Sequence, residues 1–244
     1  MLHLNHDSEQ NATQTGAPEM NTELQQIFTE NPHYKAAYDE FLELHKNGYG
    51  KNSTPEELAT FEGYYARDFL NGLKAPEDTS VLIKGERLTI RRASLSDADF
   101  MEKVELDEDN SPWVGHWPLG WRIAKFGDGH MLQTIIEKAD GTPIGIMIFC
   151  DMKNFEAELQ LKRIAIIEKG KGYGKEALYL AQKYAFEVLG TKCLSLGTKE
   201  HNTRAQSIYK ATGFTPDMPD PCTHFHIAAE DYYSRSFQQT PRLS

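Results

Sequence analysis

Apolar and polar positions follow two different periods along the chain. Over residues 21–80 the large apolar side chains recur every three or four positions, which is the spacing of one face of an α-helix. We expect two helices there, the second beginning at Thr54 with Pro55 and Glu57 completing a capping box. Their apolar faces hold Tyr34, Tyr38, Phe41, Leu42 and His45, and Leu58, Phe61, Tyr65, Phe69 and Leu73. The pattern predicts a helical hairpin that must bury these faces against another surface.

From Lys84 onward the period changes to two, the spacing of β-strands. We expect a strand over 86–94 and a helix that ends near Leu106, opened by a capping box of Ser96 and Asp99. The remaining elements are strands at 130–138, 143–152, 155–167 and 192–196, helices at 172–189 and 202–212, and a last pair of strands before Tyr233. The helix over 172–189 carries Leu178, Ala181, Ala185 and Val188 on one face. This order predicts an α/β domain over 81–244 with a mixed, largely antiparallel sheet flanked by helices.

The first twenty residues are polar and aperiodic, so ordering them would cost more entropy than their burial returns. We expect a disordered tail over 1–20. It contains no Lys or Arg and no apolar stretch, unlike a secretory signal peptide. The longest apolar run, 143–150, is too short to cross a membrane. The sequence therefore favours a cytoplasmic protein.

The formal net charge of −10 argues against general nucleic-acid binding, which needs a surplus of basic residues. Residues 1–80 hold 14 of the 36 acids and 5 of the 26 bases, so the predicted hairpin is acidic and the rest of the chain is nearly balanced. The three cysteines Cys150, Cys193 and Cys222 lack a CxxC spacing and indicate buried free thiols. His224 and His226 have no third ligand beside them, so we expect no metal site.

Residues 163–178 are the most specific segment, because a strand runs through a glycine-rich turn directly into a helix. Alternate glycines allow backbone amides to converge on an anion, and the helix N-terminus and nearby lysines add positive charge. The residues expected to hold a phosphate are Lys169, Gly170, Lys171, Gly172, Tyr173, Gly174 and Lys175. Glu176 stands where a Walker A loop needs Ser or Thr, and the glycine spacing is one residue short of a dinucleotide fingerprint. A plain turn with solvated lysines is the alternative.

The segment KGKGYG at 169–174 resembles the (Arg/Gln)xxGxGly/Ala loop of the GCN5-related N-acetyltransferases, which binds the pyrophosphate of acetyl-CoA. HNTRAQSIYKATGF at 201–214 is similar to the next conserved segment of that family, and the order of elements from Glu86 to Tyr233 matches as well. The resemblance is greatest to the branch with ribosomal-protein and spermidine acetyltransferases. It implies the acyl-CoA N-acyltransferase fold and acetyl-CoA as the acetyl donor. Lys169 departs from the pattern but keeps its positive charge.

The resemblance also implies roles for individual residues. The backbone at Ile164 and Ile166 would hold the pantetheine and polarise the thioester carbonyl, and Asn202 would contribute to the donor site. Tyr209 would protonate the leaving thiolate; alternatively, its ring only packs in the core. As a general base we consider Glu158, whose pKa burial at a sheet centre would raise. The alternatives are an exposed Glu158 paired with Lys162 or Arg163, or a relay of water molecules.

The acceptor is the least defined part of the prediction. Four acids, Glu105, Asp107, Glu108 and Asp109, lie at a helix end and can favour a cationic amine. Trp113, His116 and Trp117 follow them and can form a wall. An ordinary solvated helix end with loop-anchoring tryptophans is the other interpretation.

The sequence thus predicts an N-acetyltransferase that moves the acetyl group of acetyl-CoA to a primary amine of a small molecule or protein by direct attack in a ternary complex. The alternative is a non-catalytic acyl-CoA-binding module with a regulatory or interaction role. A homodimer and a monomer are both open. The apolar faces of the hairpin predict that it docks on the domain that follows it.

Overall fold

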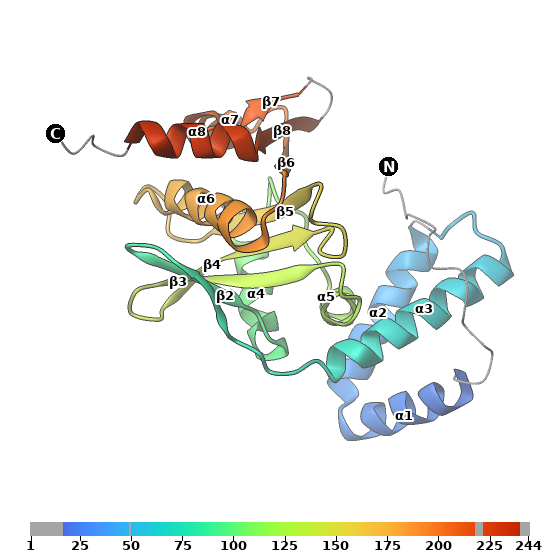
Figure 1. The fold of residues 1–244 in the computed structure, drawn as a ribbon. Coiled ribbons are helices and arrows are strands. Elements are labelled where there is room, and N and C mark those ends of the chain that lie inside the picture. Colours follow the sequence, from blue (N-terminus) through green and yellow to red (C-terminus); the bar gives the residue numbers. More distant parts are fainter. Residues whose placement is uncertain (1–16, 49, 218–221, 240–244) are drawn as a thin grey trace.

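The computed structural model describes residues 17–48, 50–217 and 222–239, and the arrangement of their elements is shown in Figure 1. Most of the predicted tail over 1–20 lies outside the described residues; its last four residues belong to the first helix. In the part that is described, no helix combines the length and apolar composition that crossing a membrane requires.

One sheet of eight strands, ordered β1-β2-β3-β4-β5-β6-β8-β7, forms the centre of the C-terminal part. The strands are β1 (Val81–Lys84), β2 (Leu88–Arg92), β3 (Leu132–Lys138), β4 (Pro143–Cys150), β5 (Leu159–Ile166), β6 (Cys193–Lys199), β7 (Thr215–Pro216) and β8 (Cys222–Ala228). All neighbours pair antiparallel except β5 and β6. The predicted mixed, largely antiparallel sheet is confirmed.

The helices are α1 (Ala17–Glu30), α2 (Pro32–Asn47), α3 (Pro55–Leu73), α4 (Ala98–Leu106), α5 (Leu119–Gly127), α6 (Tyr173–Lys183), α7 (Thr203–Ala211) and α8 (Ala229–Gln239). The helix α6 packs on one face of the sheet in a core with Leu88, Met147 and Phe149. On the other face, α4 places Met101 and Val104 against Ile146. The sheet therefore has helices on both faces, as Figure 1 shows.

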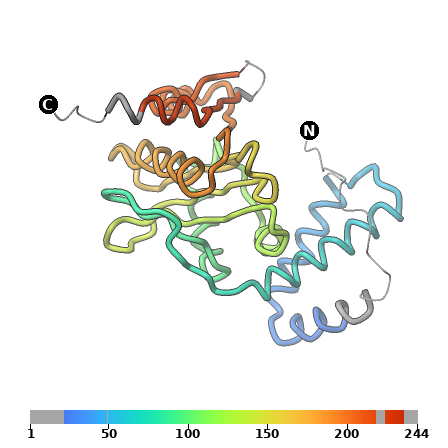
Figure 2. The backbone as a smooth tube through the Cα atoms, in the orientation of Figure 1, coloured from blue at the N-terminus to red at the C-terminus, as the bar shows by residue number. Residues whose placement is uncertain are grey.

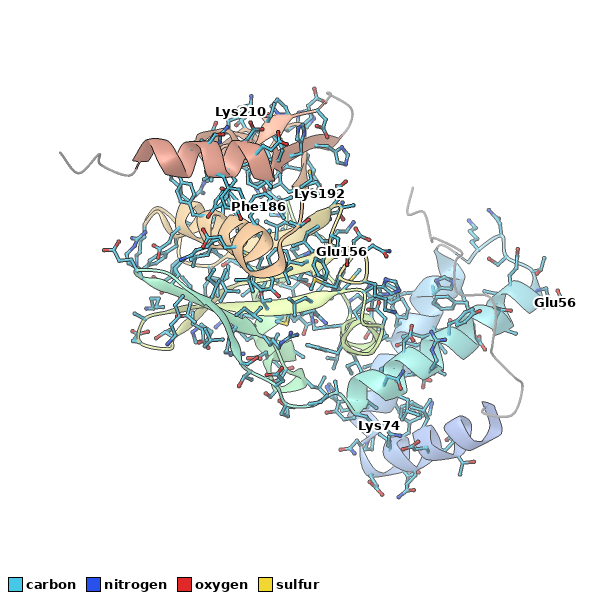
Figure 3. All side chains as sticks on the ribbon, in the orientation of Figure 1. Glu56, Lys74, Glu156, Phe186, Lys192 and Lys210 are labelled. Atoms are coloured by element: carbon cyan, nitrogen blue, oxygen red, sulfur yellow. The ribbon has the colours of Figure 1, made fainter. Side chains whose placement is uncertain are left out.

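The parallel pair β5 and β6 stays together for a short distance only. Its register joins Leu159, Gln160 and Leu161 to Leu194–Leu196, and the backbone N–H of Lys192 donates to the carbonyl of Glu156 (3.2 Å) just before the pair begins (Figure 3). Between β4 and β5 the register shifts so that Lys162 has no partner, which makes a bulge where the pairing with β6 ends. Beyond this point the sheet opens between β5 and β6.

The N-terminal helices α1–α3 pack against α5 and form a separate hydrophobic cluster with it. Phe69 and Ile123 are completely buried there, and Phe41 stacks on Trp121 with ring centroids 4.8 Å apart. Figure 2 shows this bundle at one end of the sheet, joined to β1 by a short connection after α3. The aromatic faces predicted from the sequence are thus covered by each other and by α5.

The approach of α3 to α5 is backbone to backbone. A Cβ added at Gly72 would lie 1.9 Å from the carbonyl oxygen of Ile123, and one at Gly127 would lie 2.2 Å from that of Asp68. Gly120 is equally close to α2, because its Cβ would lie 2.2 Å from the carbonyl oxygen of Ala37. Only glycine fits at these three contacts.

Several local predictions are confirmed and others are wrong. The capping box at Thr54 is present, with Glu57 N–H donating to Thr54 Oγ1 (3.2 Å). The box placed at Ser96 and Asp99 is wrong, because Asp97 accepts from Ser94 N–H (2.9 Å) and closes a 3₁₀ turn that runs into α4.

Val188, predicted on the same helix face as Leu178 and Ala181, is 56% exposed, whereas those two residues are buried. The last part of the predicted helix, Tyr184–Leu189, is π-helical, and its longer turn rotates later side chains away from the face begun by Leu178 and Ala181.

The sequence pattern missed α1, α5 and α8. No element was predicted over residues 119–127, where α5 lies; this helix begins after Pro118, contains Gly120 and ends at Gly127. Proline and glycine reduce helix propensity, so this helix depends on its packing. The helix α8 includes Tyr233, where the sequence predicted the end of a strand pair.

Gly72→Ala should destabilise the protein by about 1–3 kcal/mol, because the new Cβ forces α3 away from α5. The matched control is Gly63→Ala on the same helix, where nothing lies within 4 Å of the added Cβ and where better helix propensity should stabilise by about 0.5–1 kcal/mol. Urea unfolding of the full chain measures both. Equal midpoints for the two variants would contradict this account of the interface.

Candidate functional site

The opening between β5 and β6 continues into a cavity of 680 Å³. Its walls come from β5 over Leu161–Ile166, from the loop that leads into α6, from the end of β6 and from α7. On the other side of the sheet it reaches the loop between α4 and α5 at Trp113–Gly115. The cavity thus passes through the sheet where β5 and β6 separate.

The predicted site residues meet at this cavity, with two exceptions. Ile164, Ile166, Lys169, Gly170, Gly172, Tyr173, Gly174, Lys175, Asn202 and Tyr209 line it. Lys171 and Glu158 do not belong to its lining. The structure brings these residues together at one cavity, and their roles as a binding and catalytic site stay predictions.

The glycine loop has the backbone conformation that its sequence predicts. Gly170 and Gly172 both have φ near +78°, a left-handed conformation that side chains with a Cβ rarely adopt. Gly172 is the N-cap of α6, so the amides of the first helical turn point out of the helix beside the cavity. Gly174 has no such φ and lies within α6. The loop can hold an anion through backbone amides.

The three lysines of the loop differ in their surroundings. Lys175 lines the cavity, whereas exposed Lys171 pairs with Glu168 (Nζ to Oε2, 2.7 Å). Lys169 is half-buried, and burial lowers its pKa. Its Nζ donates to Asn110 Oδ1 and to the carbonyl of Ile166. Lys169 therefore ties the loop to buried Asn110.

Tyr209 and Asn202 come from the segment that includes α7. Tyr209 is 8% exposed, its ring packs edge-on against Phe225 (centroids 5.5 Å apart), and burial raises its pKa to about 12. Among the described residues, the Tyr209 hydroxyl has no hydrogen-bond partner. The residue Tyr209 lines the cavity. Asn202 caps α7 by accepting from Ala205 N–H (3.1 Å). Both interpretations of Tyr209 are thus compatible with its position.

Of the two placements considered for Glu158, the one at the sheet centre is wrong and the exposed one is found, with Ser195 as partner in place of Lys162 or Arg163. β5 begins one residue later, at Leu159, so Glu158 is not inside the sheet, and its side chain is exposed. Its carboxylate accepts from Ser195 Oγ at 2.5 Å. Glu158 is therefore not the desolvated base at the sheet centre that one interpretation required.

The four acids at the end of α4 differ in burial and in their contact with the cavity. Glu105 is fully buried, so it is not the exposed acceptor-binding acid that was expected. Asp107 is half-buried and Glu108 exposed, and only Asp109 lines the cavity. Of the aromatic wall, Trp113 lines the cavity at 41% exposure, while His116 pairs with Glu102 (2.8 Å) outside it.

Glu105 lies between two buried arginines. Its Oε2 is 2.7 Å from Arg122 Nη2 and accepts from Trp117 N–H (2.9 Å), and its Oε1 pairs with Arg163 Nη1. Arg122 comes from α5 and is fully buried, whereas Arg163 comes from β5 and lines the cavity. The Trp117 ring lies 4.5 Å from the Arg163 guanidinium. The carboxylate thus connects α4, α5 and the cavity.

Arg122, Arg163, Asn110 and Arg204 were not predicted from the sequence as site residues. They come from β5, α5, α7 and the turn after α4, and only the fold brings them together behind and around the cavity. The alternation in β5 did put Arg163 and Ala165 on the face opposite Ile164, which is a signal that a charged residue faces α4. His226 pairs with Asp217 as an ordinary sheet residue. Within the described ranges, no three His, Cys, Asp or Glu residues gather as a metal would require.

Comparisons with known proteins agree with this geometry. The model of the acetyltransferase (GNAT) domain matches residues 87–215, more than half of the chain. A Bacillus subtilis protein described as uncharacterized N-acetyltransferase YhfO is 31% identical over 98 residues, which are 37% of this chain and 63% of that protein.

Solved structures show the same fold. The spermidine N-acetyltransferase of Vibrio cholerae in complex with CoA and spermine matches with a TM-score of 0.53 and 16% identity, covering 61% of this chain and 99% of that one. A GNAT-family acetyltransferase of Bacillus anthracis matches with a TM-score of 0.53 and 16% identity over 62% and 99%. The N-terminal helices lie outside the residues that the family model matches.

Glu105→Gln should destabilise the protein by about 3–5 kcal/mol, because two buried guanidinium groups lose their shared carboxylate. Glu102→Gln on the same helix is the control. Its half-exposed pair with His116 should contribute no more than about 1 kcal/mol. Thermal and denaturant unfolding report both, and a Glu105 variant as stable as the control would show that the charge is not needed.

Proposed function

The chain belongs to the GNAT family of acetyltransferases, and on this premise we propose that it transfers the acetyl group of acetyl-CoA to a primary amine. The observation that carries the proposal is the cavity itself. It begins at the glycine loop, passes through the break between β5 and β6, and ends beside the α4–α5 loop. A donor and an acceptor can therefore enter from opposite faces of the sheet and meet at β5.

The donor side is formed by the glycine loop and α6. We propose that the pyrophosphate lies on the amides of Gly170–Gly174 at the start of α6, where the helix dipole favours negative charge. Lys175 adds a full charge at the cavity wall. Lys169 acts by holding the loop against Asn110. The pantetheine then extends along β5 at Ile164 and Ile166, whose inter-strand partner β6 has separated.

The chemistry requires a neutral amine, polarisation of the thioester carbonyl and a proton for the departing thiolate. We propose that the amine attacks directly in a ternary complex and that Tyr209 supplies the proton. A pKa of about 12 keeps this phenol protonated at neutral pH, as an acid must be before it donates. Since Glu158 lies outside the cavity lining, it can act as a base only through intervening water.

The acceptor end has an acidic rim at Asp109, which favours the approach of an amine in its cationic form. The V. cholerae spermidine N-acetyltransferase, which was solved in complex with CoA and spermine, supports a cationic acceptor. A cytoplasmic location is supported by the free thiols of Cys150 and Cys193. A homodimer stays a prediction. A non-catalytic acyl-CoA-binding module is the alternative, and turnover with any amine would exclude it.

Gly172→Val should abolish measurable acetyl-CoA binding in calorimetry, because the side chain strains the loop and covers its amides. Gly141→Val is the matched control. Gly141 has φ +81° in the turn between β3 and β4, with nothing within 4 Å of an added Cβ, so the substitution costs stability without touching the cavity. Unchanged affinity in the Gly172 variant would remove the basis of the donor site.

Tyr209→Phe should fold, bind acetyl-CoA normally and lose about 10²- to 10⁴-fold in kcat, the usual contribution of one proton-transfer group. Tyr184→Phe serves as the control, since Tyr184 is another buried tyrosine, packed on Phe149 and outside the cavity lining. Steady-state release of free CoA measures both variants. If the Tyr209 variant turned over as fast as the Tyr184 variant, the ring would be a packing residue only.

A further inference from the structure

The buried ion cluster behind the cavity contains more positive than negative charge. Glu105 supplies one carboxylate, and Arg122 and Arg163 supply two guanidinium groups. Arg122 Nη1 also donates to Gln133 Oε1 (3.3 Å), but this amide carries no charge. Charges buried to this degree are normally paired. Among the described residues, the cluster therefore lacks one negative charge.

Only one of the two arginines can receive that charge from a ligand. Arg122 belongs to α5, is fully buried and does not line the cavity, whereas Arg163 is 9% exposed and lines it. Burial lowers the pKa of the Arg163 guanidinium, and the neighbouring charge of Arg122 lowers it as well. A ligand anion on the cavity side would restore the balance.

The Arg163 side chain is held so that part of it remains available. Its Nη1 pairs with Glu105, and its guanidinium lies over the Trp117 ring. In the described part of the chain, Nε and Nη2 have no hydrogen-bond partner and are not sealed off in the interior. A Cβ at Gly115 would lie 3.6 Å from Nη2, so it is the absence of a side chain there that leaves this donor uncovered.

We propose that the acceptor is a primary amine that also carries a carboxylate, and that Arg163 binds this carboxylate. The proposal rests on the proposed acetyl transfer and names its substrate class. Asp109 at the rim attracts the ammonium group, while the guanidinium fork of Arg163 matches the two oxygens of a carboxylate.

The position of Arg163 also limits the size of the acceptor. Arg163 precedes Ile164 on β5, where the thioester carbonyl is proposed to lie, and its side chain is on the α4 face at the acceptor end of the cavity, so a bound carboxylate lies at the level of the reacting centre. A compact amino acid or short peptide fits this arrangement. A long polyamine would leave Arg163 without its partner.

The test compares three acceptors of equal chain length on the full native chain: an ω-amino acid, its amide and the corresponding diamine, over a series of two to six carbons. Release of CoA is measured, with rates referred to the unprotonated amine. The best amino acid should exceed its amide and the diamine by about 10- to 100-fold in kcat/KM, mainly through KM, the range of one charged hydrogen-bonded contact. Equal values for all three would overturn the carboxylate assignment and leave acetyl transfer intact.

Arg163→Gln should abolish the preference by raising KM for the amino acid while KM for its amide stays the same, and Arg163→Lys should restore part of it. Gly115→Val is a second variant that covers Nη2 without altering the ion cluster, and it should reduce the preference in the same way. Equal losses for amino acid and amide in both variants would show a structural role only. Absence of turnover with every amine would overturn the proposed function itself, and with it this inference.

Discussion

The short pairing of β5 with β6 is the constraint on which the rest of the site depends. A continuous sheet would be closed by hydrogen bonds and side chains at this point, and no cavity would cross it. Because the pairing ends at Leu161 and the bulge at Lys162 follows, the two strands diverge. The glycine loop then turns into α6 directly beside the gap. Donor site, reacting centre and acceptor end are all positioned by this one break in the hydrogen-bond ladder.

The second determinant is α5, which links two bodies of hydrophobic packing. One side of it packs with α3 through Ile123, and the other side carries Arg122 into the cluster with Glu105. The N-terminal helices are thus connected to the cavity wall through one short helix and one carboxylate. They lie outside the segment matched by the family model, yet they cover a helix that lies within it.

The sequence predicted those parts of the fold whose signals are local. The glycine loop could be predicted because Gly170 and Gly172 adopt a left-handed backbone conformation that residues with a Cβ rarely adopt. The helix start at Thr54 could be predicted because the capping box is complete within four residues. The helix α5 was missed because its packing, and not its propensity, stabilises it.

The role of Glu105 was misread for a related reason. An acid at a helix end looks solvated until the partners of opposite charge, distant in the sequence, are placed beside it. The sheet-centre placement of Glu158 was wrong by one residue, since β5 begins at Leu159. Tertiary contacts decide such cases, and one sequence does not display them.

The three glycine contacts of the N-terminal bundle have a consequence for recognising related chains. At Gly72, Gly120 and Gly127 the space is filled by backbone of another helix, so a single methyl group forces the helices apart. A homologous chain that preserves all three glycines is therefore expected to carry the docked bundle even where the rest of its extension has diverged beyond alignment. Conversely, an extension joined to a domain with larger residues at these positions must attach elsewhere. Glycine at these three positions thus serves as a sequence marker for the docked arrangement of the helices.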